Sequence, residues 1–202
     1  MNRAMVRNIL ATYYRASRAD RAEGVQWYNT AHGIAVGFSR DYGVTLEVAA
    51  AVISLLSPNN KWSRNVADAE RMLQAYRLGA DMDSFTVSTY SNNKMKAWDL
   101  LHGVRDIETV YGRGLKTQAF GATIASPTTT ESVVIDGHAY HIAIAERGPL
   151  SAVPQLSKKA YRELEDAYRV AAGRAAVSPT VMQATTWVTW RNEKYDTKNP
   201  TN

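Results

Sequence analysis

The sequence predicts an all-α protein of about nine helices. Apolar residues recur every three or four positions over most of the chain, and capping residues and glycines mark the ends of these stretches. The β-branched run Val133–Ile135 is too short to build a sheet. With 202 residues, 45% of them hydrophobic, the chain suits one large domain or two small lobes.

Four helices are expected in the N-terminal half, over about residues 5–13, 25–38, 46–56 and 62–76. The first is predicted because Met5, Ile9 and Tyr13 are spaced at i, i+4 and i+8, as in an amphipathic helix. Thr45 is a suitable N-cap for the third helix, which is apolar on every side and should therefore lie in the middle of a core. Gly79 ends the fourth helix.

The C-terminal half should contain helices over about residues 92–102, 106–110, 115–125 and 136–146, with two more starting at 157 and 178. Met95, Trp98 and Leu101 should face inward. Ser178 followed by Pro179 is a strong helix start, a capping side chain and a proline in the first turn. Residues 192–202 are polar and are expected to form a frayed tail.

Composition limits the classes of function. The net charge of +5, from 24 Lys and Arg against 19 Asp and Glu, suits a polyanionic partner. The absence of cysteine excludes disulfides, thiolate catalysis and cysteine-held iron–sulfur clusters. Without an apolar run of membrane-spanning length or a secretory signal, we expect a cytoplasmic protein of a bacterial cell or its nucleoid, with no membrane contact and no obligate protein partner.

The segment from Val110 to Thr117 carries the clearest functional pattern. Gly112 and Gly114 permit a tight turn between two helices and leave backbone N–H groups uncovered at the start of the second, where a phosphate can bind. Lys116 falls in the first turn of that helix and would gain nucleophilic character if partly desolvated. The alternative is an ordinary glycine turn followed by a solvated lysine.

Four blocks in order resemble the helix-hairpin-helix (HhH-GPD) DNA glycosylase superfamily, and its endonuclease III-like core in particular. The hairpin pattern Leu-Pro-Gly-Val-Gly-x-Lys-Thr-Ala is matched from Val110 onward, with Tyr111 and Arg113 as departures. The Val-Asp-Thr-His segment is matched by residues 135–138, with Gly137 in place of Thr. Residues 55–60 are similar to the family's Leu-Leu-Ser-x-Gln loop, and residues 90–97 to the segment before its next helix.

The resemblance implies a single two-lobed unit over residues 1–191, with the hairpin at about 106–125 in the central lobe. It implies a DNA glycosylase/AP lyase that acts on a flipped-out base of double-stranded DNA. Lys116 and Asp136 would be catalytic, as amine nucleophile and as the carboxylate that stabilises an oxocarbenium-like sugar. The implied DNA contacts are Gly112, Arg113, Gly114, Thr117, Asn59, Asn60, Lys94 and Lys96, and the implied base pocket is Tyr28, Trp62 and His138.

Two alternatives stay open. The segments flanking the core resemble phage and actinobacterial proteins, so the same fold could carry a phage-type base hypermodification enzyme similar to amino acid:DNA transferases. A non-catalytic DNA-binding protein could retain the hairpin alone. His138 and His141 lack a third well-spaced ligand, so no metal site is expected. No cofactor is expected either, with a monovalent cation at the hairpin left open.

Overall fold

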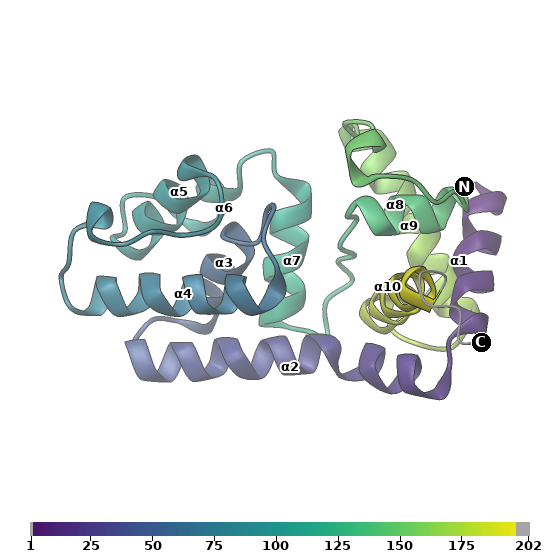
Figure 1. The fold of residues 1–202 in the computed structure, drawn as a ribbon, viewed down its shortest axis with the longest axis horizontal. Coiled ribbons are helices and arrows are strands. Elements are labelled where there is room, and N and C mark those ends of the chain that lie inside the picture. Colours follow the sequence, from purple (N-terminus) through teal and green to yellow (C-terminus); the bar gives the residue numbers. More distant parts are fainter. Residues whose placement is uncertain (1, 197–202) are drawn as a thin grey trace. The chain divides into compact units, whose positions relative to one another are not determined.

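A computed structural model describes the backbone of residues 2–196 and the side chains of residues 2–193. Within these residues the chain forms ten α-helices, two short 3-10 helices and no strand (Figure 1). The prediction of an all-α protein is therefore confirmed, and each α-helix overlaps a segment that the sequence predicts to be helical. No helix in this part of the chain is long and apolar enough to cross a membrane.

The helices group into two compact units. Unit 2 is one continuous stretch, residues 30–126, whereas unit 1 combines the chain before residue 30 with the chain after residue 126. Helix α2 (Arg18–Tyr42) contributes its first half to unit 1 and its second half to unit 2. Each unit is described by itself below.

Unit 2 is built around α3 (Leu46–Leu55), every residue of which from 49 to 55 is buried. Helices α4 (Trp62–Arg77), α5 (Ser91–Leu101), α6 (Ile107–Tyr111) and α7 (Leu115–Ala125) all pack against it, and Figure 1 shows α7 beside it. A short 3-10 helix, η1 (Met82–Ser84), lies between α4 and α5. Thr45 caps α3 by accepting the Val48 N–H at 3.3 Å, so both the cap and the central position of this helix are confirmed.

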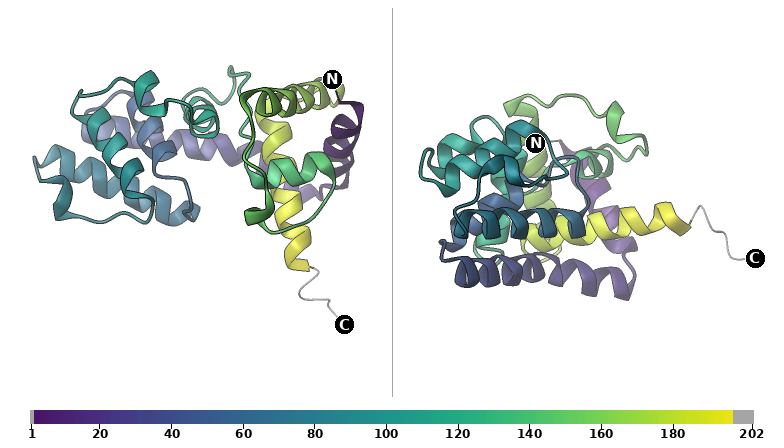
Figure 2. Two further views of the ribbon diagram at one scale, coloured as in Figure 1. Left: turned by 90° about the horizontal axis from the view of Figure 1, so that it is seen from above. Right: turned by 60° about the vertical axis from the view of Figure 1, so that its left-hand side comes forward.

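Unit 1 is built around α1 (Arg3–Arg15). It packs against α8 (Gly137–Ile144), α9 (Lys158–Arg174) and α10 (Pro179–Asp196). Figure 2 shows these four helices gathered together, with the end of α10 running beyond the others. The 3-10 helix η2 (Leu150–Ala152) lies between α8 and α9. The largest fully buried side chains of this core include Ile9, Leu164 and Tyr168.

Several predicted boundaries and faces are wrong. Helix α1 buries Val6, Ile9 and Thr12, so Ile9 is buried as its spacing predicts, whereas Met5 and Tyr13 are only half-buried. Met95 is 39% exposed because α5 turns Ala97, Leu100 and Leu101 inward. Helix α8 stops before residue 146, since Ala145 adopts a left-handed conformation. Helix α10 continues through residues 192–196, where the sequence predicts a frayed tail, and residues 197–202 lie outside the described part.

Candidate nucleic-acid interface

Two successive tight turns join α6 to α7. Gly112 has φ 53° and ψ −118°, which is the first central position of a type II′ turn closed by the Gly114 N–H on the Tyr111 carbonyl at 2.9 Å. Gly114 has φ −78° and ψ 69°, an inverse γ-turn in which the Leu115 N–H donates to the Arg113 carbonyl at 3.0 Å. Gly112 therefore occupies backbone space that few other residues adopt.

The first turn of α7 is left without a side-chain cap. Its N-cap residue is Gly114, which has no side chain to accept the backbone N–H groups of Lys116 and Thr117. The Thr117 hydroxyl donates to the Gly114 carbonyl at 2.8 Å, so it is used within the turn. Helix α6 differs, because Asp106 accepts the Thr109 N–H at 2.7 Å, and this backbone bond holds the pKa of Asp106 below its usual range.

The hairpin is anchored to α3 through Tyr111. The buried Tyr111 hydroxyl lies 3.0 Å from the Ser54 hydroxyl of α3, and burial raises the pKa of Tyr111. Gly121 of α7 faces the same spot, because a Cβ built there would overlap the Tyr111 hydroxyl and lie 3.1 Å from Ser54 Oγ. The close approach of α7 to α3 therefore needs glycine at position 121.

The loop of residues 57–61 is brought next to α7 by an aromatic pair. The Trp62 ring, at the start of α4, meets the Phe120 ring edge to face at 6.2 Å. Phe120 follows Lys116 by four residues, so both lie on one face of α7. The structure thus joins two blocks that are about sixty residues apart in the sequence. Sequence reasoning misses Phe120, although its i+4 spacing from Lys116 is a usable signal.

The two asparagines of that loop, Asn59 and Asn60, are both implied DNA contacts but have different environments. Asn59 is exposed and has φ 55°, a left-handed conformation that asparagine tolerates better than most residues. Asn60 is turned inward, and its amide donates to the Leu56 carbonyl at 3.3 Å and to Asp68 Oδ2 at 3.0 Å. Only Asn59 is placed to meet a partner from solvent.

The cations of unit 2 divide into two groups, and the first is held by neighbouring acceptors. An acidic side chain or a backbone carbonyl oxygen binds each of Arg40, Arg71, Arg77 and Arg105. Lys94 belongs to the same group. Its ammonium donates to the carbonyl oxygens of Met82, at 2.6 Å, and Phe85, and lies 4.3 Å from the centre of the Phe85 ring. These contacts use Lys94 to hold η1 within unit 2, which leaves its expected phosphate contact without support.

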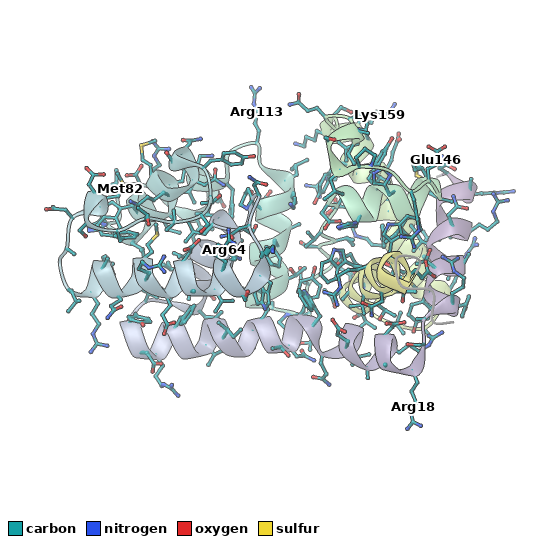
Figure 3. All side chains as sticks on the ribbon, viewed as in Figure 1. Arg18, Arg64, Met82, Arg113, Glu146 and Lys159 are labelled. Atoms are coloured by element: carbon teal, nitrogen blue, oxygen red, sulfur yellow. The ribbon has the colours of Figure 1, made fainter. Side chains whose placement is uncertain are left out.

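The side chains of five other cationic residues of unit 2 make no hydrogen bond, ion pair or ring contact within the part of the chain that the structure describes. We call them the open cations, and they are Lys61, Arg64, Lys96, Arg113 and Lys116. Four of the five belong to the hairpin or to the start of α4, the two segments joined by the aromatic pair. Figure 3 shows Arg113 pointing away from the ribbon at the turn before α7.

Asp136 lies in unit 1, whereas Lys116 lies in unit 2. It is the N-cap of α8, where Oδ1 accepts the Ala139 N–H at 2.8 Å. The extended run before it is held by the Tyr161 hydroxyl, which accepts the Ile135 N–H and donates to the Val133 carbonyl, both at 3.1 Å. Burial raises the pKa of Tyr161. Asp136 therefore caps α8, and its Oδ2 makes no hydrogen bond in unit 1.

Of the residues implied for the base pocket, Tyr28 and His138 belong to unit 1, whereas Trp62 belongs to unit 2. The His138 ring is 6.3 Å from the Trp187 ring in an edge-to-face arrangement. Tyr28 is 5% exposed and donates its hydroxyl hydrogen to Gln183 Oε1 at 2.7 Å. His141 is buried, and neither of its ring nitrogens has a hydrogen-bond partner among the described residues. In the same part of the chain, no group of three or more His, Asp or Glu side chains is arranged to hold a metal ion.

Comparisons with known proteins identify a family but no activity. Searches of curated proteins and of solved structures each return no match. A family model described as "Family of unknown function (DUF7178)" matches residues 1–194, which include all of unit 2 and most of unit 1. The chain belongs to this family, DUF7178.

Proposed function

We propose that this chain binds double-stranded DNA through the hairpin of unit 2. The observation that carries the proposal is the uncapped first turn of α7, which presents free backbone N–H groups directly beside the exposed side chains of Arg113 and Lys116. Free N–H groups at a helix start attract a phosphate through hydrogen bonds and the helix dipole. The two cations add the charge neutralisation that drives DNA binding.

The neighbouring loop extends this surface. Lys61 and Arg64 flank Trp62, and Trp62 packs against the face of α7 that carries Lys116. Asn59 is exposed at the same loop. A phosphate backbone held at the hairpin would therefore meet further cations and one exposed amide. The HhH-GPD resemblance supports the same surface and, as part of this proposal, a two-lobed fold of that type.

The salt dependence of binding tests the proposal. Each phosphate contact contributes about 0.9 to the slope of log K against log salt concentration. Arg113→Gln with Lys116→Gln should therefore lower the magnitude of the slope by about 1.8, measured by fluorescence anisotropy on a labelled duplex. Arg40→Gln with Arg105→Gln is the matched control, because it removes the same charge from two cations that already have acidic partners. Equal slopes for the two double variants would contradict the proposal.

We also propose an AP lyase activity of the glycosylase type, for which Lys116 supplies the amine. Its ammonium is exposed and has no partner in unit 2. After losing a proton, the amine would attack C1′ of an open abasic sugar, and loss of water would give a Schiff base. For base excision itself, Asp136 is the carboxylate proposed to stabilise the oxocarbenium-like sugar.

Borohydride trapping separates the lyase from simple binding. Reduction on DNA with an abasic site should give a covalent adduct with the native chain and with Lys96→Ala, but not with Lys116→Ala. Lys96 is the control because it is another open cation of unit 2. Intact DNA binding with no adduct in the native chain would refute the lyase and leave the binding proposal standing.

A further inference from the structure

Unit 1 contains a cavity of about 180 Å³ that the DNA-binding proposal does not use. It lies between one face of α2 and the start of α10, beside the segment that follows residue 126. Its walls include Val25, Tyr28, Asn29, Thr128, Thr180 and Val181, and no charged side chain lines it. A cavity of about 150 Å³ is enough to hold benzene, so this one can take a single six-membered ring.

The wall hydroxyls of Tyr28, Ser178 and Thr180 already donate their hydrogens to other groups of the protein. The Thr180 hydroxyl donates to the Pro127 carbonyl at 3.0 Å, so the 2.9 Å contact between Ser178 and Thr180 must be donated by Ser178. The Tyr28 hydroxyl donates to Gln183. A ligand therefore finds few hydrogen-bond donors in the interior of the cavity.

Asn29 and Thr128 are exposed wall residues with unused donor and acceptor capacity, and in the Asn29 amide the two stand side by side. One of its two amide hydrogens is donated to the Val25 carbonyl at 3.3 Å. The second N–H and the Oδ1 oxygen make no hydrogen bond within unit 1. This donor–acceptor pair is complementary to a lactam edge, in which a ring N–H stands next to a ring carbonyl, as when Asn pairs with a base edge.

We propose that this cavity binds one uncharged six-membered heterocycle with a lactam edge, its ring against Tyr28 and Val181 and its lactam edge on Asn29. The site goes beyond the proposed DNA contact of unit 2, and its test uses a free heterocycle without DNA. Failure of one proposal is therefore distinguishable from failure of the other.

Uracil and 1,3-dimethyluracil form a matched pair of probes, because methylation removes both ring N–H donors and keeps the ring. Titration of the full chain, followed by amide NMR shifts, should show uracil moving the resonances of the lining residues. Dimethyluracil should bind about tenfold more weakly, the effect of losing one good hydrogen bond. Equal affinity for the two probes, or no shift at the lining residues with uracil, would overturn the proposal.

Two valines of α2 provide a matched pair of variants. Val25 lines the cavity and Val36 does not, yet each is 44% exposed on the same helix. Val25→Trp should close the cavity and weaken uracil binding by more than about tenfold, whereas Val36→Trp should leave it unchanged. Asn29→Ala should lower the affinity for uracil to that for dimethyluracil. If Val25→Trp binds uracil as well as Val36→Trp does, the cavity is not the binding site.

Discussion

Gly121→Ala should destabilise unit 2 by forcing apart two helices that meet without a side chain between them. The added methyl group would overlap the Tyr111 hydroxyl and lie 3.1 Å from Ser54 Oγ. Tyr111 is 5% exposed and cannot move far without breaking its hydrogen bond to Ser54. The perturbation therefore adds atoms to a closed space and removes a buried hydrogen bond together.

The expected magnitude combines three effects. Overpacking a buried site costs about 1–3 kcal/mol. Leaving a buried hydroxyl without its partner costs about 1–3 kcal/mol. Replacing glycine by alanine inside a helix stabilises the helix by about 1 kcal/mol, which offsets part of this loss. The free energy of unfolding should therefore fall by about 3 kcal/mol, which for a chain of this size corresponds to a fall in Tm of about 6–12 °C.

Urea unfolding followed by circular dichroism measures the change, with two companion variants. Ser54→Ala leaves the Tyr111 hydroxyl without its partner but adds no atom, so it should cost about 1–3 kcal/mol. Gly37→Ala is the matched glycine control, because a Cβ at this position of α2 meets no atom within 4 Å. It should raise stability by about 0.5–1 kcal/mol.

The reasoning fails if Gly121→Ala is as stable as the native chain or more so. A loss equal to that of Ser54→Ala would show that the methyl group is accommodated and that only the hydrogen bond matters. A loss larger than that of Ser54→Ala, with Gly37→Ala stabilising, is the pattern that the packing predicts.

Three further predictions concern single side chains. The Thr109 N–H lowers the pKa of Asp106 in the folded chain. The stabilisation from this carboxylate should therefore be complete above the pKa that Asp106 has in the unfolded chain, and lost as the pH falls through its folded pKa. An NMR titration in which the pKa of Asp106 is not lowered would contradict this. Asp136→Ala should lower the free energy of thermal unfolding by about 1 kcal/mol, because it removes the α8 cap. Asp136→Ser should keep most of this stability, since serine can also cap a helix. Equal losses for the two variants would exclude the capping role. Tyr161→Phe should lower the free energy of unfolding in urea by about 1–3 kcal/mol, since two buried backbone groups lose their partner. Tyr14→Phe, at a side chain that is 61% exposed, should change it little. Similar losses for the two variants would refute this reasoning.

Features that depend on neighbouring residues could be predicted from the sequence. Ser157 and Ser178 are recognisable as helix starts because a capping side chain accepts an N–H three residues later, and both make that bond, at 3.2 Å. The bounds of α7 match the prediction for the same reason, since glycines and polar residues mark both of its ends. The hairpin geometry follows from Gly112 in the same local way.

Features that depend on distant partners could not be predicted in this way. The ring contact between Trp62 and Phe120 cannot be predicted from the sequence pattern of either segment alone. Lys94 resembles a solvated cation in the sequence, but its ammonium is held by carbonyl oxygens around η1, a short turn without a periodic pattern to reveal it. The burial of Val6 and Thr12 on α1 could not be predicted, because the partners that decide it, α8 to α10, lie more than a hundred residues away.

The continuity of residues 30–126 within one unit has a consequence for the order in which the protein folds. During synthesis all of unit 2 has been made before α8, α9 and α10 exist, so its core can close from local contacts. Helix α1 must wait, because its main packing partners, α8, α9 and α10, follow unit 2 in the chain. Closing a flexible loop of that length would cost about 4 kcal/mol of chain entropy, and a folded unit 2 shortens the loop beforehand. Helix α1 is thus synthesised before unit 2 but buried after it.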